Sequence, residues 1–125
     1  GMPKLSILRI NNNPIENLPE NFSTLKHLST LEADSCSFIK LPETFGKLVA
    51  LRRLLLSGNK LTELPESFGE LSQLKTLRLR NNNLTQLCNS FEKLQNLREL
   101  DLYMNNLKSI PKELNLFGNK ESGGI

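Results

Sequence analysis

A repeat with a period of 23 residues runs through most of this chain and constrains its fold more than any other feature. The most regular column of the repeat consists of Leu8, Leu31, Leu54, Leu77 and Leu100. Another column holds Asn13, Cys36, Asn59, Asn82 and Asn105. The composition follows this pattern, with 27 leucines and 15 asparagines among the 125 residues. A regular period of this length is typical of a solenoid, in which each copy is one coil and neighbouring coils share a core.

Each copy reads LxxLxLxxNxLxxLPxxFxxLxx, and this pattern resembles the leucine-rich repeat family, whose signature is L-x-x-L-x-L-x-x-N/C-x-L. The resemblance covers about residues 5–114. The repeat length and the LPxxF half are similar to those of intracellular Ras-signalling scaffolds, cell-polarity scaffolds and some bacterial proteins. Membership implies an α/β fold, a right-handed solenoid. It would carry about five parallel strands on its concave face and short helical or irregular segments on its convex face.

The repeats predict a single domain over residues 1–125. They occupy residues 5–27, 28–50, 51–73, 74–96 and 97–114, and a tail without the pattern occupies residues 115–125. A chain of this length has room for one hydrophobic core. Neither the start of the first repeat nor the tail resembles the polar cap usual in the family. The outermost strands should therefore expose unpaired edges and cause weak self-association.

Alternating side chains explain why such copies stack. Residues 51–57, LRRLLLS, place apolar side chains on one face of a short strand. Parallel strands about 4.8 Å apart would bury that face in a core shared along the stack. The Asn after each strand is placed to satisfy buried backbone groups, and Cys36 takes this place in the second copy.

The second half of each copy predicts a short helical turn. Its first residue is expected to be a proline, which lacks only an N–H that would be unpaired there, as in Pro19, Pro42 and Pro65. A glutamate follows each of these prolines, near the positive end of the helix dipole. The phenylalanines of this half should face the core, and they are Phe22, Phe45, Phe68 and Phe91.

The residue types that carry enzyme chemistry are sparse and scattered. His27 is the only histidine, and the repeat places it in the turn before the second strand, where it should face solvent or pack locally. No Ser, Cys or carboxylate is placed to form a triad with it. Cys36 and Cys88 lie in different columns, farther apart than the roughly 7 Å between Cα atoms that a disulfide allows. We therefore expect free thiols and no enzyme activity.

Other ligand classes are equally disfavoured by the sequence. One histidine and two separated cysteines cannot supply four zinc ligands, and no glycine-rich phosphate loop is present, so no metal and no cofactor are predicted. The longest apolar runs, such as residues 54–56, are far below the roughly 18 residues of a membrane span. No apolar block at the start resembles a secretory signal. The expectation is a cytoplasmic protein that does not bind membranes.

The outward columns of the strands form the concave face, where partners of this family usually dock. Its predicted centre consists of Arg53, Leu55, Arg78, Arg80 and Tyr103. Carboxylates flank this centre on both sides, namely Glu32, Asp34, Glu99 and Asp101. Arginine, tyrosine and an outward leucine favour a protein-binding site. The alternative is that opposite charges on neighbouring strands pair with one another, at roughly 0.2–1 kcal/mol per pair, and keep the surface soluble.

The predicted function is a non-catalytic protein–protein interaction module, a scaffold or adaptor in signalling, that holds a protein partner on its concave face. One alternative is a segment of a larger repeat protein in signalling, or of a secreted bacterial effector, without its own ligand. Another is weak nucleic-acid binding through the central arginines, which four flanking carboxylates and a single tyrosine disfavour.

Overall fold

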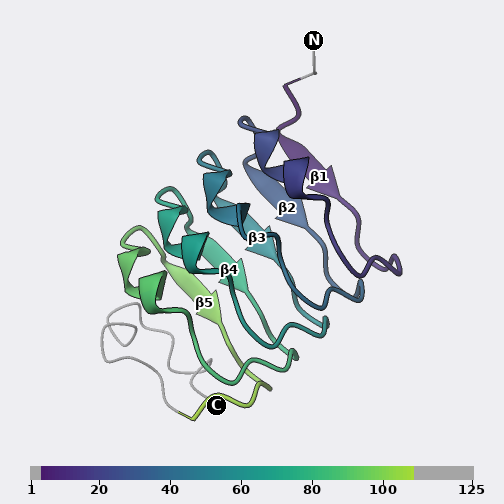
Figure 1. Cartoon of the computed structure of the whole chain (residues 1–125), viewed down its shortest axis with the longest axis vertical. Helices are drawn as coiled ribbons and strands as arrows, with labels where there is room; N and C mark the ends of the chain where they lie inside the picture. The colour runs from purple at the N-terminus through teal and green to yellow at the C-terminus, as the bar shows by residue number, and fades with distance from the viewer. Residues whose placement is uncertain (1–3, 109–125) are drawn as a thin grey trace.

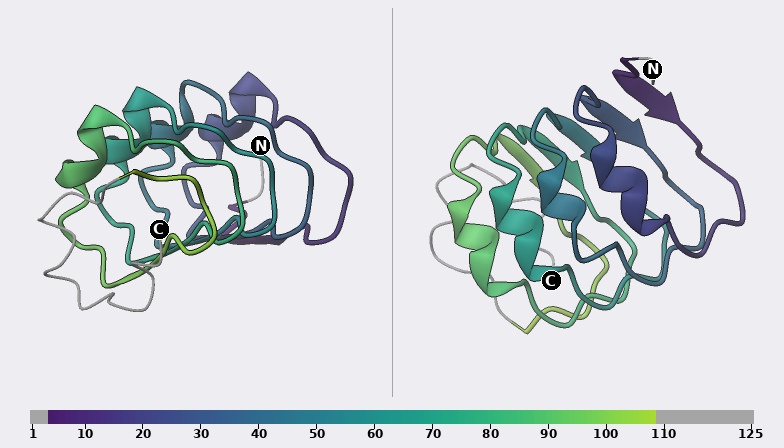
Figure 2. Two further views of the ribbon diagram at one scale, coloured as in Figure 1. Left: turned by 90° about the horizontal axis from the view of Figure 1, so that it is seen from below. Right: turned by 45° about the horizontal axis from the view of Figure 1, so that its top comes forward.

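The computed structural model describes residues 4–108, and in this range five short parallel strands form one sheet. The strands are β1 (Ile7–Arg9), β2 (Thr30–Glu32), β3 (Arg53–Leu55), β4 (Thr76–Arg78) and β5 (Glu99–Asp101). Their order in the sheet is their order in the chain, so each coil pairs with the next (Figures 1 and 2). This is the predicted α/β solenoid. The end of the fifth repeat and the tail 115–125 lie outside the described residues.

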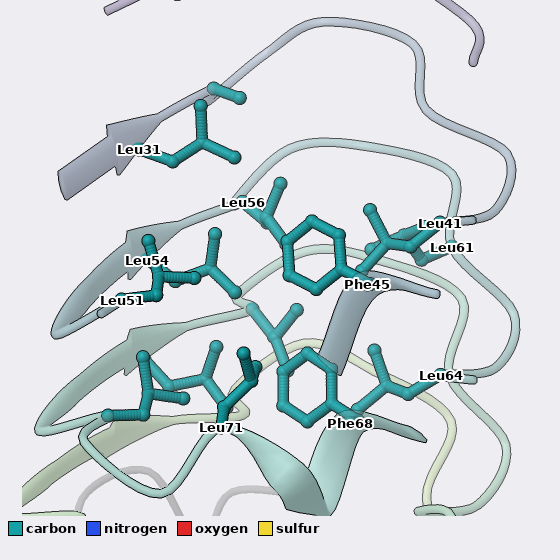
Figure 3. Close-up of a cluster of buried hydrophobic side chains, with 14 of the residues drawn as sticks. Leu31, Leu41, Phe45, Leu51, Leu54, Leu56, Leu61, Leu64, Phe68 and Leu71 are labelled. Atoms are coloured by element: carbon teal, nitrogen blue, oxygen red, sulfur yellow. The ribbon is translucent and has the colours of Figure 1, made fainter. Parts of the chain in front are cut away.

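The strands pair in the register that the repeat predicts. Leu31 lies opposite Leu54, and Leu54 lies opposite Leu77, each at an offset of one repeat. All three side chains have 0% exposed surface and belong to one core cluster with the buried phenylalanines and leucines of the coils. Figure 3 shows Leu54 in this cluster with Phe45 and Phe68. Leu8 is only partly buried, because β1 is an edge strand of the described sheet. In this column of leucines, the side chains are therefore buried from the second coil onwards.

Short 3-10 helices form the other half of four coils. They are η1 (Glu20–Thr24), η2 (Phe45–Lys47), η3 (Glu66–Glu70) and η4 (Asn89–Lys93). The prediction that proline is the first helical residue is wrong. Pro19 and Pro65 are N-caps with ψ of 153° and 151°, because the ring fixes φ and leaves ψ extended. In the second coil the helix begins two residues later still, so Glu43 lies outside it.

The asparagine column forms the predicted internal ladder. Asn59 Oδ1 accepts hydrogen bonds from the backbone N–H groups of Cys36 at 3.2 Å and Phe38 at 3.0 Å. Its Nδ2 donates to the carbonyls of Ala33 at 3.0 Å and Leu56 at 2.9 Å. One amide thus satisfies backbone groups of two coils, which would otherwise be buried without partners. Cys36 continues the ladder through its thiol, which donates to a carbonyl of the preceding coil, that of Ile10, at 3.2 Å.

On the helical side the coils approach closely around a stack of aromatic rings. The rings of Phe45 and Phe68, and those of Phe68 and Phe91, are parallel within 6° and 2°, with centroids 6.1 Å apart in both pairs. Gly69 follows the central ring, and its N–H donates to Ser90 Oγ at 2.9 Å. A Cβ at this glycine would collide with the Ser90 carbonyl, so glycine permits the close approach.

Candidate protein-binding face

The concave face consists of three outward columns that the strand pairing keeps in line. The columns are Ile7, Thr30, Arg53, Thr76 and Glu99; then Arg9, Glu32, Leu55, Arg78 and Asp101; then Asn11, Asp34, Ser57, Arg80 and Tyr103. The third column lies just beyond the strands, and backbone bonds such as Gly58 N–H to the Arg80 carbonyl at 2.8 Å hold it in register. All nine residues predicted for the site lie on this face.

Two of the predicted arginines pair with neighbouring carboxylates. Arg78 donates to Glu99 Oε2 from two nitrogens, at 2.9 and 2.6 Å. Arg80 Nε donates to Asp101 Oδ2 at 2.8 Å. Both contacts run diagonally, since Asp101 is the residue directly opposite Arg78 in the register. Because all four side chains are partly exposed, each pair contributes about 0–1 kcal/mol to stability. The pairing that was the alternative interpretation of the charges therefore occurs at these two arginines.

Tyr103 is the main aromatic side chain offered to a partner on this face. It is 40% exposed, and the Arg80 guanidinium lies 5.0 Å from the centre of its ring. The cation over the ring and the ion pair to Asp101 together restrict the Arg80 side chain. Restricted side chains lose less conformational entropy on binding, so this cluster is partly preorganised for contact. Met104 follows Tyr103 and is 55% exposed.

Leu55 is less accessible than its outward position predicts. The sequence places it on the concave face, and the pairing confirms this, with Glu32 on one side and Arg78 on the other. The side chain is nevertheless only 6% exposed. Long polar side chains on adjacent strands can lay their apolar stems over a leucine between them. The expectation of an exposed apolar centre at Leu55 is therefore wrong, and among the residues predicted for the site the exposed ring is that of Tyr103.

Glu32, on β2, interacts with several polar and charged side chains near the N-terminal end of the concave face. Arg9 Nε donates to its Oε2 at 3.2 Å, and Asn11 Nδ2 donates to its Oε1 at 3.3 Å. The hydrogen bond from Arg9 is the main cause of a pKa below the usual value for this carboxyl, with Asn11 and the charge of Arg53 acting in the same direction. Arg53 itself makes no ion pair or side-chain hydrogen bond within the described residues, so among the three predicted arginines its guanidinium is the one that is not already paired there.

The aspartates of the predicted site serve the backbone as well as the surface. Asp34 Oδ1 accepts the N–H of Ser57 at 2.8 Å, and Asp101 Oδ1 accepts the N–H of Tyr103 at 3.0 Å. Asn11 does the same one coil earlier, since its Oδ1 accepts the N–H of Asp34 at 2.7 Å. These side chains fix the third column in place. Sequence reasoning missed this role, although Asn11 and Asp34, an amide and a carboxylate in the same column, were a visible signal of it.

The residues that could carry catalysis or bind a metal do not form a common site. His27 is exposed, Cys36 is buried in the ladder, and both Cys36 and Cys88 are free thiols. Burial raises the pKa of the Cys88 thiol above its usual range, and Glu66 acts in the same direction while the hydrogen bond with Ser90 opposes it. Residues 4–108 hold no group of three or more metal-ligating side chains. In the same part of the chain, no helix is long and apolar enough to cross a membrane.

Parallel strands in strict register, a shared leucine core and an asparagine ladder define a solenoid repeat protein. A model of the leucine-rich repeat region matches residues 2–114. The chain belongs to the leucine-rich repeat family. A comparison with curated protein sequences gave no significant match.

Solved structures of the same fold include bacterial and plant proteins. The Leptospira interrogans leucine-rich repeat protein LIC12759 is similar with a TM-score of 0.85 and 36% identity, over 90% of this chain and 29% of its own. The leucine-rich repeat domain of the type III effector XCV3220 (XopL) has a TM-score of 0.82 and 26% identity, over 93% and 42%. A chain of the BIR3–SERK2 complex from Arabidopsis thaliana has a TM-score of 0.75 and 29% identity, over 88% and 62%. This chain thus spans less than two thirds of each of these structures.

Proposed function

We propose that this chain is a non-catalytic interaction module that holds a protein partner on its concave face, as a cytoplasmic scaffold or adaptor in signalling. The observation that carries the proposal is the cluster of Arg80, Asp101 and Tyr103, in which a partly exposed ring and a cation are held in place. Tyrosine and arginine are the types that contribute most to protein interfaces. Arg53, on β3, adds a cation that makes no ion pair with residues 4–108.

The backbone of the face supports a positional mechanism. Each strand is only three residues long, but it is hydrogen-bonded to its neighbours, and the central strands β2, β3 and β4 are anchored on leucines with no exposed surface. A partner would meet side chains whose spacing is already fixed, so the ordering cost on binding is small. A relative of the same fold was solved as part of a complex of two named proteins, BIR3 and SERK2, which fits a role in protein binding.

A pair of matched variants tests where the partner binds. The concave variant combines Arg53→Glu with Tyr103→Ala. The control combines Lys40→Glu with Ile39→Ala, which makes the same change in charge and removes an apolar side chain of similar exposure, 45% against 40%. Residues 39 and 40 lie between β2 and η2, away from the sheet.

Each protein is used as bait in a pull-down from the native source, and circular dichroism checks that all three fold equally. We expect wild type and control to retain the same partner proteins and the concave variant to lose them. If the control loses the partners while the concave variant retains them, the concave face is not the binding site. If wild type captures no protein that the unfolded chain does not also capture, the proposed function is wrong.

A further inference from the structure

A row of cations borders the concave face where three consecutive strands begin. Arg52, Lys75 and Arg98 occupy one column of the repeat, each immediately before the first residue of β3, β4 or β5 (Figure 1). The two earlier members of the column are the neutral residues Ser6 and Ser29. We call Arg52, Lys75 and Arg98 the basic ridge.

The backbone holds the ridge at a fixed spacing. The Lys75 N–H donates to the Arg52 carbonyl at 2.8 Å, and the Arg98 N–H donates to the Lys75 carbonyl at 2.8 Å. The same carbonyls also accept from the next residues, Thr76 and Glu99, at 3.0 Å. Directly bonded neighbours of this kind lie about 4.8 Å apart, so the three Cα atoms span about 10 Å.

None of the three cations is neutralised within the described residues. All three residues are exposed, and their side chains make no ion pair or hydrogen bond with residues 4–108. The carboxylate next to the row, that of Glu99, is 2.6 Å from Arg78 and is already paired. Like charges on adjacent strands repel, and at these separations salt of about 0.15 M screens them only in part, since the Debye length is about 8 Å. An anionic ligand would relieve this repulsion.

We propose that the basic ridge docks an acidic, extended peptide segment of the protein partner. This inference rests on the proposed function, because the ridge continues the concave face at Arg53. Alternate side chains of an extended peptide lie on one face about 6.7 Å apart, so three carboxylates span about 13 Å. The long side chains of arginine and lysine can cover the difference from the ridge.

The surroundings favour a peptide over a nucleic acid. The ridge ends at Ser29 on one side, and the carboxylates of Glu32 and Asp34 lie on the neighbouring coil. A polyphosphate chain would extend past the three cations to this coil, where Ser29 offers no cation and Glu32 already holds Arg9, whereas a short acidic segment would not. Tyr103, beyond the opposite end of β5 from Arg98, offers apolar contact to the rest of a protein partner.

The test uses a fluorescein-labelled peptide of alternating Glu and Thr, its Gln-for-Glu counterpart, and an oligothymidylate of equal charge, all measured by fluorescence anisotropy. The ridge variant is Arg52→Gln, Lys75→Gln and Arg98→Gln. The control is Lys40→Gln, Lys60→Gln and Lys93→Gln, three exposed lysines outside the concave face without side-chain partners in the described residues. Both variants lower the net charge of +3 by three, to zero.

We expect wild type to bind the Glu peptide and not the Gln peptide, the ridge variant to bind it about tenfold more weakly, and the control to stay within about twofold. Equal weakening in both variants would show an effect of net charge alone and overturn the proposal. The proposal is also overturned if the wild type does not bind the Glu peptide or binds the oligothymidylate more tightly than the Glu peptide.

The same ridge variant, used as bait in the pull-down, separates this inference from the proposed function. Loss of the partners that wild type retains supports the ridge as part of the binding site. If the ridge variant keeps every partner that Arg53→Glu with Tyr103→Ala loses, the ridge proposal fails and the concave face still stands as the binding site. If wild type captures no partner, the proposed function fails whatever the peptide result.

Discussion

At the scale of single residues, the points where the strands end share an unusual backbone. The five residues there have positive φ, namely Asn12 at 62°, Ser35 at 53°, Gly58 at 71°, Asn81 at 59° and Met104 at 61°. Glycine and asparagine suit this left-handed conformation, whereas a residue such as methionine is strained by roughly 1–2 kcal/mol. The residue type at this position therefore shows in which coils the left-handed turn is favourable, as with glycine or asparagine, and in which it is strained, as with methionine.

We expect Met104→Asn to stabilise the protein by about 0.5–1 kcal/mol, because asparagine tolerates the left-handed conformation that this position requires. Urea unfolding followed by circular dichroism measures the change. Met104→Ala serves as the control, because alanine removes the exposed side chain without relieving the backbone. An equal increase in the free energy of unfolding in both variants would show that the effect comes from loss of the methionine side chain and not from relief of the backbone.

The two thiols should react slowly for different reasons. Cys36 is 9% exposed and its thiol is hydrogen-bonded in the ladder, so we expect iodoacetamide to modify it only on unfolding. Cys88 is less enclosed, but burial raises the pKa of its thiol and keeps the thiolate scarce at neutral pH. The rate of Cys88 alkylation should therefore keep rising with pH beyond the pH at which the rate for a free thiol levels off. Mass spectrometry of peptides after timed alkylation checks both, and modification of Cys36 at the rate of an unfolded control would contradict the assigned ladder.

At the scale of elements, each strand is stable only because its neighbours complete the core. Leu54 and Leu77 are fully buried between coils that are held by backbone bonds on both sides. Truncation of either residue to alanine should cost about 2–5 kcal/mol, because the neighbouring coils cannot collapse onto the cavity. Chemical denaturation of the single variants measures this. The same change at Leu8, which is half-buried, should cost clearly less, and a cost at Leu8 equal to that at Leu54 would contradict the burial gradient.

The elements show where sequence reasoning succeeds and where it stops. The repeat predicted the strands, their register and the Asn59 ladder, because a fixed period places equivalent residues opposite one another in a parallel sheet. It assigned Pro19 and Pro65 to the first helical position, whereas in the structure they are the N-caps, one residue earlier. The proline ring fixes φ but not ψ, so the sequence does not distinguish these two positions. The diagonal bond of Arg78 to Glu99 and the covering of Leu55 depend on side-chain rotamers, which the period does not specify.

At the scale of the whole molecule, the first coil exposes two apolar side chains: Leu5, whose counterparts in the later coils are buried, and Ile7 on the outward face of β1. Leu5 is 36% exposed and Ile7 is 46% exposed, and β1 has an unpaired edge within the described residues. Unpaired edges with apolar side chains promote association between chains. We expect weak, concentration-dependent self-association in sedimentation velocity, reduced by Ile7→Lys. A strictly monomeric size at high concentration would contradict this.

The concave face meets a partner as one unit, because the sheet beneath it fixes its side chains, and Tyr103 is its main exposed aromatic contact. The most direct test replaces Tyr103, or Ile39 outside the sheet, with a photo-crosslinking phenylalanine derivative and irradiates the protein in extract of its native source. The concave placement predicts a crosslinked product of discrete mass from position 103, competed by unlabelled wild type, and none from position 39. Crosslinks from position 39 alone would contradict the account.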